Sequence, residues 1–241
     1  MRVLQLIADS GVAMSRAELV KTCGLTRPTV YRIIDSLEAE ALIEATGDRR
    51  YRLGGRLVSL ARLALAQSDI RKIAEPSLAR LRDATGETVH LAIRSGDEMV
   101  YIDKIESHEV VRMASTIGTR AQFHSSGVGK AYLSAMTIPE ADQLIDAIAL
   151  PAITEFTTTR REVLRKTVRQ AREDGFVRDV QENELGIVCF GAAVRESIDH
   201  PVASVSVSVP LFRLDDTRRY NEPLLEAVTA ISKLLGFVHT S

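Results

Sequence analysis

Apolar residues recur at helical spacing in short segments at the start of the chain. The first segment, Val3 to Ile7, fits a short helix that ends at the Ser10-Gly11 turn. A second helix is expected over Arg16 to Cys23, because Ser15 and Glu18 have the three-residue spacing of a capping box. Gly24 then provides the backbone freedom for a tight turn.

The third segment has the clearest periodicity. Its apolar residues fall at i, i+3, i+4 and i+7 and predict one buried stripe: Val30, Ile33, Ile34 and Leu37. Thr26 and Pro28 mark the start of this helix. Two helices joined by a short glycine turn form a helix-turn-helix, whose second helix reads base edges in the major groove of DNA.

Two short alternating runs follow in "ALIEATGDRRYRL", Ala41 to Leu53, and predict a β-hairpin that turns at Gly47-Asp48. Arg49, Arg50 and Arg52 cluster on this wing, where cationic side chains neutralise DNA phosphates. We therefore predict a winged helix-turn-helix DNA-binding domain over residues 1–56. The alternative is a helical interaction domain with a solvated arginine cluster.

A helical stretch connects this domain to the rest of the chain. "GGRLVSLARLALAQS", Gly54 to Ser68, carries an apolar stripe too continuous for a free linker: Leu57, Leu60, Ala61, Ala64 and Leu65. We expect a connector helix over residues 57–69 that packs against a second copy of the chain. The alternative is that the stripe packs within its own chain.

The pattern over residues 70–241 predicts an α+β domain. A helix from Ile70 to Gly86 precedes a meander of strands over residues 88–95, 98–107 and 109–115. Helices are then expected over 126–135, 139–149 and 160–174, strands over 176–180, 187–194 and 202–209, and a final helix over 217–235. Strands in two groups around helices resemble small-molecule sensor domains of the GAF or PAS type.

Composition limits the function classes. The 241 residues are 45% apolar, with a formal net charge of -1, so DNA contact requires a local basic patch. Residues 1–70 supply it modestly, with ten Lys and Arg against eight Asp and Glu. Cys23 and Cys189 form no disulfide framework, and no export signal or membrane-spanning stretch is recognisable, so a cytoplasmic protein without membrane contact is expected.

The stretch "HSSGVGKAYL", His124 to Leu133, superficially resembles a phosphate-binding loop. The Walker pattern needs a glycine where His124 stands and a hydroxyl where Ala131 stands, so nucleotide hydrolysis is not expected. A helix that begins around Ser125 to Gly127 has exposed N–H groups, which favour a carboxylate as readily as a phosphate.

Two strands near the C-terminus carry further polar groups. In "ASVSVSVP", Ser204, Ser206 and Ser208 share one face of a strand, and the pattern by itself favours serines that face water over serines that line a pocket. "DVQENELGIVCFGAAV" places Asp179 at an acidic turn, which by itself is expected to be solvated, and Cys189 on an apolar strand, where a cysteine is expected to pack as a small apolar residue. The histidines have no metal-ligand spacing and form no recognisable catalytic group, so neither a metal, nor a cofactor, nor catalysis is expected.

Three segments together resemble the IclR family of bacterial transcription regulators. They are "LTRPTVYRIIDSLEAEALIE" with its wing, "FHSSGVGKAYLS", and "DVQENELGIVCFGAAV" followed by "HPVASVSVSVP". The resemblance implies a winged-helix domain that binds a palindromic operator in double-stranded DNA as a homodimer or homotetramer. It also implies a C-terminal domain that binds a small organic acid or aromatic effector between its sheet and the helix of the glycine loop.

The resemblance also assigns residues, position by position. The expected DNA-binding residues are Arg27, Thr29, Tyr31, Arg32, Arg49 and Arg50. The expected effector-binding residues are Ser126, Gly127, Val128, Asp179, Cys189, Ser206 and Ser208. The chain departs from the family at Val194, often a proline, and at Val209, often a glycine, and the larger Val209 is expected to alter the floor of the pocket. The alternative function is a small-molecule enzyme or sensor of GAF-like fold with an appended interaction domain.

Overall fold

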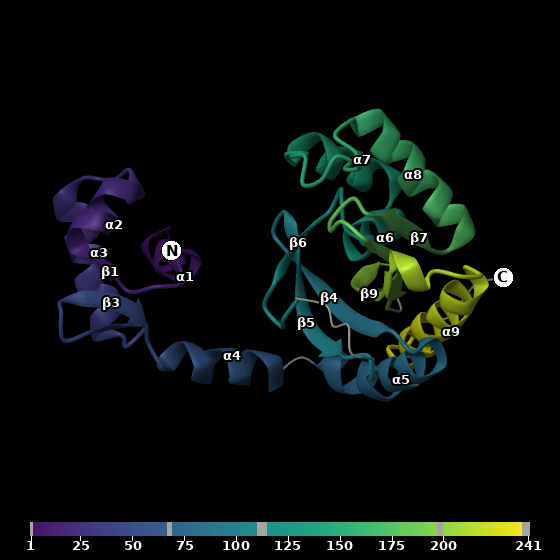
Figure 1. Ribbon diagram of the computed structural model, residues 1–241, viewed down its shortest axis with the longest axis horizontal. Helices are drawn as coiled ribbons and strands as arrows, with labels where there is room; N and C mark the ends of the chain where they lie inside the picture. Colours follow the sequence, from purple (N-terminus) through teal and green to yellow (C-terminus); the bar gives the residue numbers. More distant parts are fainter. Residues whose placement is uncertain (1, 67–68, 110–114, 197–199, 238–241) are drawn as a thin grey trace. The chain divides into compact units, whose positions relative to one another are not determined.

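The computed structural model describes residues 2–66, 69–109, 115–196 and 200–237, and the chain divides into two compact units, residues 1–68 and 69–241 (Figure 1). The expected connector helix is α4 (Arg56–Ala66), which belongs to the first unit. Each unit has its own hydrophobic core and is described by itself.

The first unit has the elements of a winged helix-turn-helix. Helices α1 (Arg2–Ser10), α2 (Arg16–Cys23) and α3 (Arg27–Ala39) precede strands β2 (Ile43–Ala45) and β3 (Arg50–Leu53). The two-residue strand β1 (Met14–Ser15) adds to β3, so the wing is a three-stranded antiparallel sheet in the order β1-β3-β2 rather than the hairpin alone.

Local signals explain the helix boundaries in this unit. The capping box at the start of α2 is present, with Ser15 and Glu18 bonded in both directions, and Gly24 ends the helix with φ +69°. Val30 and Ile34 of α3 are fully buried against Val3, Ile7 and other apolar side chains of the unit. The apolar stripe of α3 thus faces the core, and the opposite side of the helix faces solvent.

The second unit is built around one antiparallel sheet of six strands. In chain order it contains α5 (Asp69–Thr85), β4 (Thr88–Ser95), β5 (Glu98–Ile105), β6 (Arg120–Gln122), α6 (Gly127–Ala135), α7 (Ile138–Ala147), α8 (Arg161–Asp174), β7 (Val177–Val180), β8 (Ile187–Arg195), β9 (Pro201–Pro210), the 3-10 turn η1 (Leu211–Arg213) and α9 (Arg218–Leu234). The strand order is β6-β5-β4-β9-β8-β7, so the pairing of β4 with β9 joins the two groups of strands.

Helices cover both faces of this sheet. Helices α5 and α9 pack on one face (Figure 1). On this face Phe190 of β8 stacks on Tyr220 of α9, with 5.3 Å between the ring centroids. Helix α6 packs on the other face, with α7 and α8 beyond it. The α6 face carries polar groups. Ser208 pairs with Thr88 of β4 and with Cys189 of β8, and residues that pair across strands share one face of the sheet, so these three side chains lie together on the α6 face.

Four expectations about this unit need correction. Ser204, Ser206 and Ser208 are buried beneath α6 instead of facing water, because α6 covers their face of β9. The N–H groups at the start of α6 are not exposed, because Ser125, Ser126 and Gly127 are all buried. The acidic turn is not wholly solvated, because Asp179 is buried. Val209 does not form the floor of a pocket on this face, because it alternates with Ser208 and pairs with Val188 on the opposite face.

The third strand of the expected meander falls largely on residues 110–114, outside the described residues. Strand β5 pairs with β4 on one side and with the short β6 on the other, and the hydrophobic pattern did not indicate β6.

Candidate functional site

Helix α3 presents four of the expected DNA-binding residues in its first two turns. Arg27 and Arg32 are exposed, while Thr29 and Tyr31 are half-buried. The Thr29 hydroxyl is 2.8 Å from that of Thr26, and the Nε–H of Arg27 donates to the Tyr31 hydroxyl at 3.2 Å. The buried Val30 and Ile34 fix the rotation of the helix, so this polar surface is presented outward.

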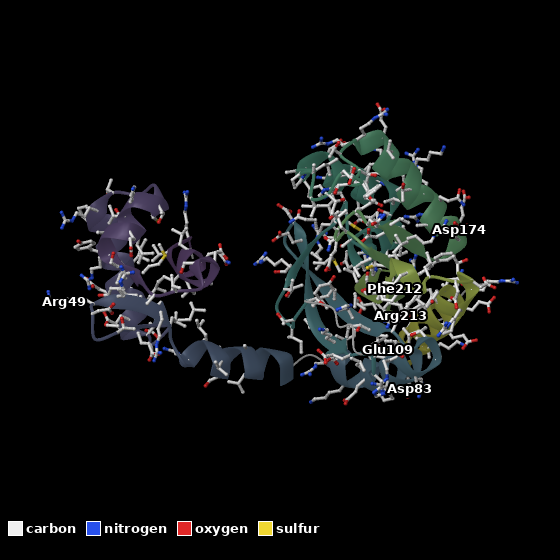
Figure 2. The ribbon with its side chains drawn as sticks, viewed as in Figure 1. Arg49, Asp83, Glu109, Asp174, Phe212 and Arg213 are labelled. Carbon is white, nitrogen blue, oxygen red and sulfur yellow. The ribbon has the colours of Figure 1, made fainter. Side chains whose placement is uncertain are left out.

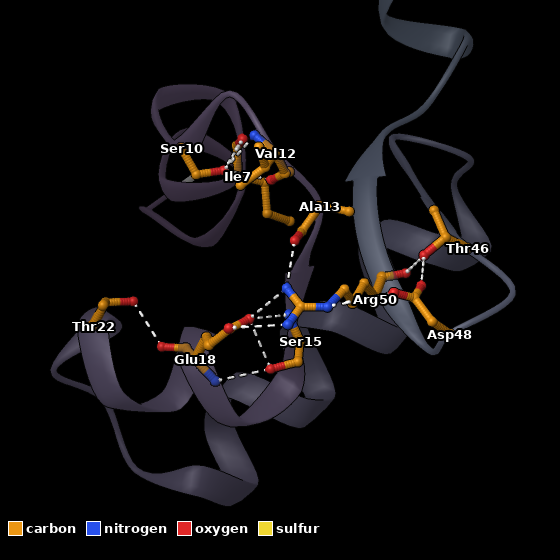
Figure 3. A network of polar contacts seen from close by, with 10 residues as sticks. All are labelled: Ile7, Ser10, Val12, Ala13, Ser15, Glu18, Thr22, Thr46, Asp48 and Arg50. Atoms are coloured by element: carbon orange, nitrogen blue, oxygen red, sulfur yellow. Dashed lines mark hydrogen bonds and ion pairs between the residues drawn. The ribbon is translucent and has the colours of Figure 1, made fainter.

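The two adjacent wing arginines have different environments. The Arg50 guanidinium donates to the Ala13 carbonyl and forms ion pairs with Glu18 and Asp48, which ties the wing to α2 (Figure 3). Arg49 has φ +60° and is exposed at the tip of the wing (Figure 2). Its guanidinium has no hydrogen bond or ion pair to any residue that the structure describes. Arg49 is therefore available to a phosphate, whereas Arg50 already has protein partners.

A cavity of about 250 Å³ lies at the α6 face of the second unit. Its lining residues come from β4, from β5, from β6 and the connection that precedes it, from β7 and the turn that follows it, and from β8 and β9. They are His90, Tyr101, Ser115, Thr119, Arg120, Ala121, Asp179, Asn183, Glu184, Ile187, Cys189 and Ser208. The cavity combines an aromatic ring and short apolar side chains with hydroxyl, amide and carboxyl groups, as ligand sites commonly do.

Three of the expected effector-binding residues line this cavity. Asp179, Cys189 and Ser208 are brought together because β7 pairs with β8 and β8 with β9, in register at these positions. The Cys189 sulfur is 3.4 Å from the Ser208 hydroxyl. Pairing across three strands thus gathers groups from two separate sequence motifs.

The other expected effector-binding residues do not line the cavity. Ser206 lies further along β9, opposite Gly191. The Ser126 hydroxyl caps α6, accepting from Gly129 N–H and donating to the Gln122 carbonyl. Gly127 packs closely against Cys189, since a Cβ added at Gly127 would lie 3.1 Å from the Cys189 Cβ. The start of α6, which includes Val128, therefore lies behind the part of the cavity wall that Cys189 forms.

His90 and Tyr101 are cavity residues that the sequence motifs did not indicate. The His90 ring lies 4.6 Å from the Tyr101 ring, its Nε2 is 2.7 Å from the Ser115 hydroxyl, and its Nδ1 is 3.4 Å from the Ser208 hydroxyl. A histidine inside an otherwise apolar strand was the available signal. The pairing of β4 with β9 is what brings this histidine next to Ser208 in the cavity.

Arg120 also lines the cavity, but its guanidinium forms an ion pair with Glu98 at 2.6 Å. In the β5–β6 register Ala121 pairs with Met99 and belongs to the buried α6 face, so Arg120 lies on the opposite face of its strand. We therefore assign its contribution to the cavity wall to its main chain.

Burial controls the ionisation of the cavity groups. Desolvation raises the pKa of Asp179 to about 7, although Lys130 and the Glu182 N–H, which donates at 2.8 Å, favour the charged form. Burial and the nearby Lys104 lower the pKa of His90 to about 3, so this imidazole is neutral at physiological pH. Burial also raises the pKa of the Cys189 thiol, which therefore remains protonated.

Lys130, the lysine of the glycine loop, is not available to a phosphate. It is buried, its Nζ donates to the Arg178 carbonyl at 3.0 Å, and it forms an ion pair with Glu182. Thr157 also donates to the Glu182 carbonyl at 2.6 Å. Lys130 therefore holds the turn that carries the acidic side of the cavity.

No group of three or more His, Cys, Asp or Glu residues within the described ranges could hold a metal ion. No helix among the same residues is both long and apolar enough to span a membrane.

Family models match almost the whole chain. The IclR helix-turn-helix domain matches residues 1–47, and the bacterial transcriptional regulator IclR C-terminal domain matches residues 62–233. The HTH-type transcriptional regulator XynR of Escherichia coli is 30% identical over 240 residues, which cover 98% of this chain and 95% of XynR.

Solved structures agree in fold. The crystal structure of the Thermotoga maritima IclR is 30% identical, with a TM-score of 0.74 and coverage of 98% of this chain and 96% of the other. An IclR homologue from Microbacterium hydrocarbonoxydans, crystallised in complex with 4-hydroxybenzoate, is 25% identical, with a TM-score of 0.78 and the same coverage of both chains. The expected winged helix-turn-helix and α+β effector-domain folds are thus confirmed.

Proposed function

The chain belongs to the IclR family of bacterial transcriptional regulators, and from this premise we propose which residues bind DNA and which bind the effector. The protein is a DNA-binding transcription regulator with a C-terminal effector-binding domain. The observation that carries the proposal is the presence, in one chain, of a helix α3 with exposed arginines and a separate domain with a polar, partly aromatic cavity.

Arg27, Thr29 and Arg32 contact base edges of the operator, and Arg49 contacts a phosphate. The exposure of Arg27 and Arg32 on the first turns of α3, and of Arg49 at the tip of the wing, supports these contacts, and the half-buried Thr29 lies between the two arginines along the same helix. N-terminal residues of a recognition helix enter the major groove. Arg50 acts mainly on the orientation of the wing, because its guanidinium is bonded to Ala13, Glu18 and Asp48.

The effector is a small organic acid or a small aromatic compound. A volume of about 250 Å³ suits a molecule of this size, and the similar IclR homologue from Microbacterium hydrocarbonoxydans was crystallised with 4-hydroxybenzoate. Asp179, Cys189 and Ser208 contact the effector together with His90 and Tyr101. Ser126, Gly127, Val128 and Ser206 act indirectly, by holding α6 against the wall of the cavity.

The chain works as a homodimer or a homotetramer. Helix α4 supports this assignment, because Leu60 and Leu63 on one side of it are 45% and 48% exposed, a large apolar exposure for a short helix. A palindromic operator requires two copies of α3, and a connector that pairs would set their spacing.

The protein carries out no catalysis and acts in the cytoplasm, where bacterial DNA lies. The buried, protonated Cys189 and the neutral His90 support a binding role, since neither is activated as a nucleophile. A small-molecule enzyme with an appended interaction domain is the alternative, and conversion of a bound acid by the purified chain would favour it.

The proposal is tested by coupling the two sites. Small carboxylic acids and phenols, 4-hydroxybenzoate included, are screened for an increase in the melting temperature of the full chain. A stabilising compound is then titrated into a complex with operator DNA at fixed salt concentration. The operator dissociation constant should change with saturation of the compound, and an unchanged constant at full saturation would reject regulation through this cavity.

A further inference from the structure

One guanidinium joins three elements of the DNA-binding unit. The Nε–H of Arg16, at the start of α2, donates to the Tyr51 hydroxyl of β3 at 2.8 Å. Its Nη2 donates to Asp35 of α3 at 2.7 Å. Its Cζ also lies 5.1 Å from the centre of the Tyr31 ring on α3 and 5.5 Å from that of Tyr51. The Tyr31 ring is thus held from the side of α2 and the wing.

Arg27 rests on the same tyrosine. Its Cζ lies 5.2 Å from the centre of the Tyr31 ring, and its Nε–H donates to the Tyr31 hydroxyl at 3.2 Å. The two residues are four positions apart on one helix, where side chains are neighbours. A ring contact and a hydrogen bond together fix the plane of the guanidinium, which a single contact would leave free to rotate.

The Tyr31 hydroxyl accepts a hydrogen bond only from Nε of Arg27, so the other two guanidinium nitrogens are left for a ligand. No hydrogen bond or ion pair joins Nη1 or Nη2 of Arg27 to the part of the chain that the structure describes. These two nitrogens form a planar fork of donors, the geometry that matches O6 and N7 of a guanine in the major groove. Arg27 is also the first residue of α3, at the end of the helix that enters the groove.

We propose that Tyr31 is a positioning residue, anchored by Arg16, that orients Arg27 to read one guanine of each operator half-site through Nη1 and Nη2. This inference rests on the proposed DNA-binding function. It changes the role of Tyr31 from a direct DNA contact to a residue that acts through Arg27. Restricting Arg27 before binding lowers the conformational entropy lost when the base contact forms.

The first test measures base preference with the full-length chain. Double-stranded DNA selected by the unaltered chain from a random library provides the probe, and binding is measured to probes changed at each base pair. Arg27→Ala should lower the preference for guanine at one base pair by about ten-fold or more, as expected for loss of a bidentate contact. Tyr31→Phe retains the ring and should lower the preference at the same base pair by about three-fold, while other positions keep theirs.

Thr22→Val is the matched control. It also removes one hydroxyl from the same unit, but this hydroxyl donates to the Glu18 carbonyl within α2 and is not bonded to Arg16, Tyr31 or Arg27. The guanine preference should survive in this variant. An equal loss of affinity for all probes in Tyr31→Phe, or an unchanged guanine preference, would overturn the positioning role. A chain that enriches no sequence from the library would instead reject the DNA-binding function, and the inference with it.

The second test needs no DNA. The Nε–H groups of Arg27 and Arg32 are compared by heteronuclear NOE in the unaltered chain and in Tyr31→Phe. Arg27 should lose order on the picosecond to nanosecond timescale, while Arg32 keeps its value. Unchanged order of Arg27 would count against the proposal even if the variant bound DNA more weakly.

Discussion

At Asp179 the fold surrounds a carboxyl group with hydrogen-bond donors and still disfavours its charge. The Glu182 N–H donates to it and Lys130 lies nearby, yet burial dominates and raises the pKa to about 7. The folded chain therefore retains a proton between about pH 4 and pH 7 that the unfolded chain releases. Through this interval the contribution of Asp179 to the free energy of unfolding falls as the pH rises.

Asp179→Asn should remove that pH dependence. Because a single proton is involved, Asp179 changes the free energy of unfolding by at most about 1.4 kcal/mol per pH unit within this interval. Urea unfolding of the full chain at pH 5 and pH 8 measures the difference between the two conditions. Asp97→Asn, on an exposed turn, should retain the difference seen for the unaltered chain. If Asp179→Asn retained it as well, the buried carboxyl would not be its source.

Arg32 and Arg49 should affect DNA binding differently. Arg32 is exposed on α3, so Arg32→Ala should weaken operator binding by about 1–3 kcal/mol and binding to random DNA much less. Arg49→Ala should weaken both and reduce the slope of log K against log salt concentration by about one. Gel-shift titrations at several salt concentrations measure both effects. An equal loss on operator and random DNA would make Arg32 a phosphate contact.

Among the elements, α6 and β8 approach each other through two glycines. A Cβ on Gly191 would lie 2.2 Å from the Gly127 carbonyl oxygen, a main-chain atom that cannot rotate away. This approach places the start of α6 directly behind Cys189. The glycines of this contact thus determine where the cavity wall lies.

Gly191→Ala should therefore move α6 and destabilise the second unit by about 3 kcal/mol, the upper part of the usual cost of overpacking. It should also weaken effector binding. Gly186→Ala is the control, because it has φ +77° but nothing within 4 Å, and about 1 kcal/mol of backbone strain is expected there. Urea unfolding compares the two variants, and a similar small loss in both would contradict the close contact.

Helix α4 should contribute to self-association through its exposed apolar stripe. Leu60→Glu places a charge on that stripe and should lower the molar mass measured by light scattering at micromolar concentration. Val58→Glu is more exposed but lies about 200° around the helix from Leu60, so it should leave the mass unchanged. A mass that persists in Leu60→Glu would assign self-association to another surface.

At the scale of the whole molecule, regulation requires the cavity and the operator to influence each other. If saturation with the effector changes operator affinity by some factor, saturation with operator must change effector affinity by the same factor. Calorimetric titration of effector into the free chain and into the operator complex measures the second factor. Unequal factors would indicate that the compound acts at a site outside this two-site equilibrium.

The sequence by itself determined the order and type of nearly all the helices and strands, the winged helix-turn-helix and the family. These features are encoded locally, in the spacing of Val30 and Ile34, in the Ser15–Glu18 capping box and in the alternation of Ser206 and Ser208 with valines. Local patterns decide which residues share one side of an element, because a helix or strand has a fixed period, but they did not predict that the serine side of β9 is buried beneath α6.

Only the tertiary structure decided what those buried sides meet. His90 and Ser208 are 118 residues apart and approach within one cavity because β4 pairs with β9, a choice that no local pattern specifies. Arg49 and Arg50 are neighbours in sequence, yet one is free of ion pairs among the described residues and the other binds Glu18 and Asp48. Pairing over long distances and competition among charges depend on three-dimensional packing, and these determine the cavity and the surface that binds DNA.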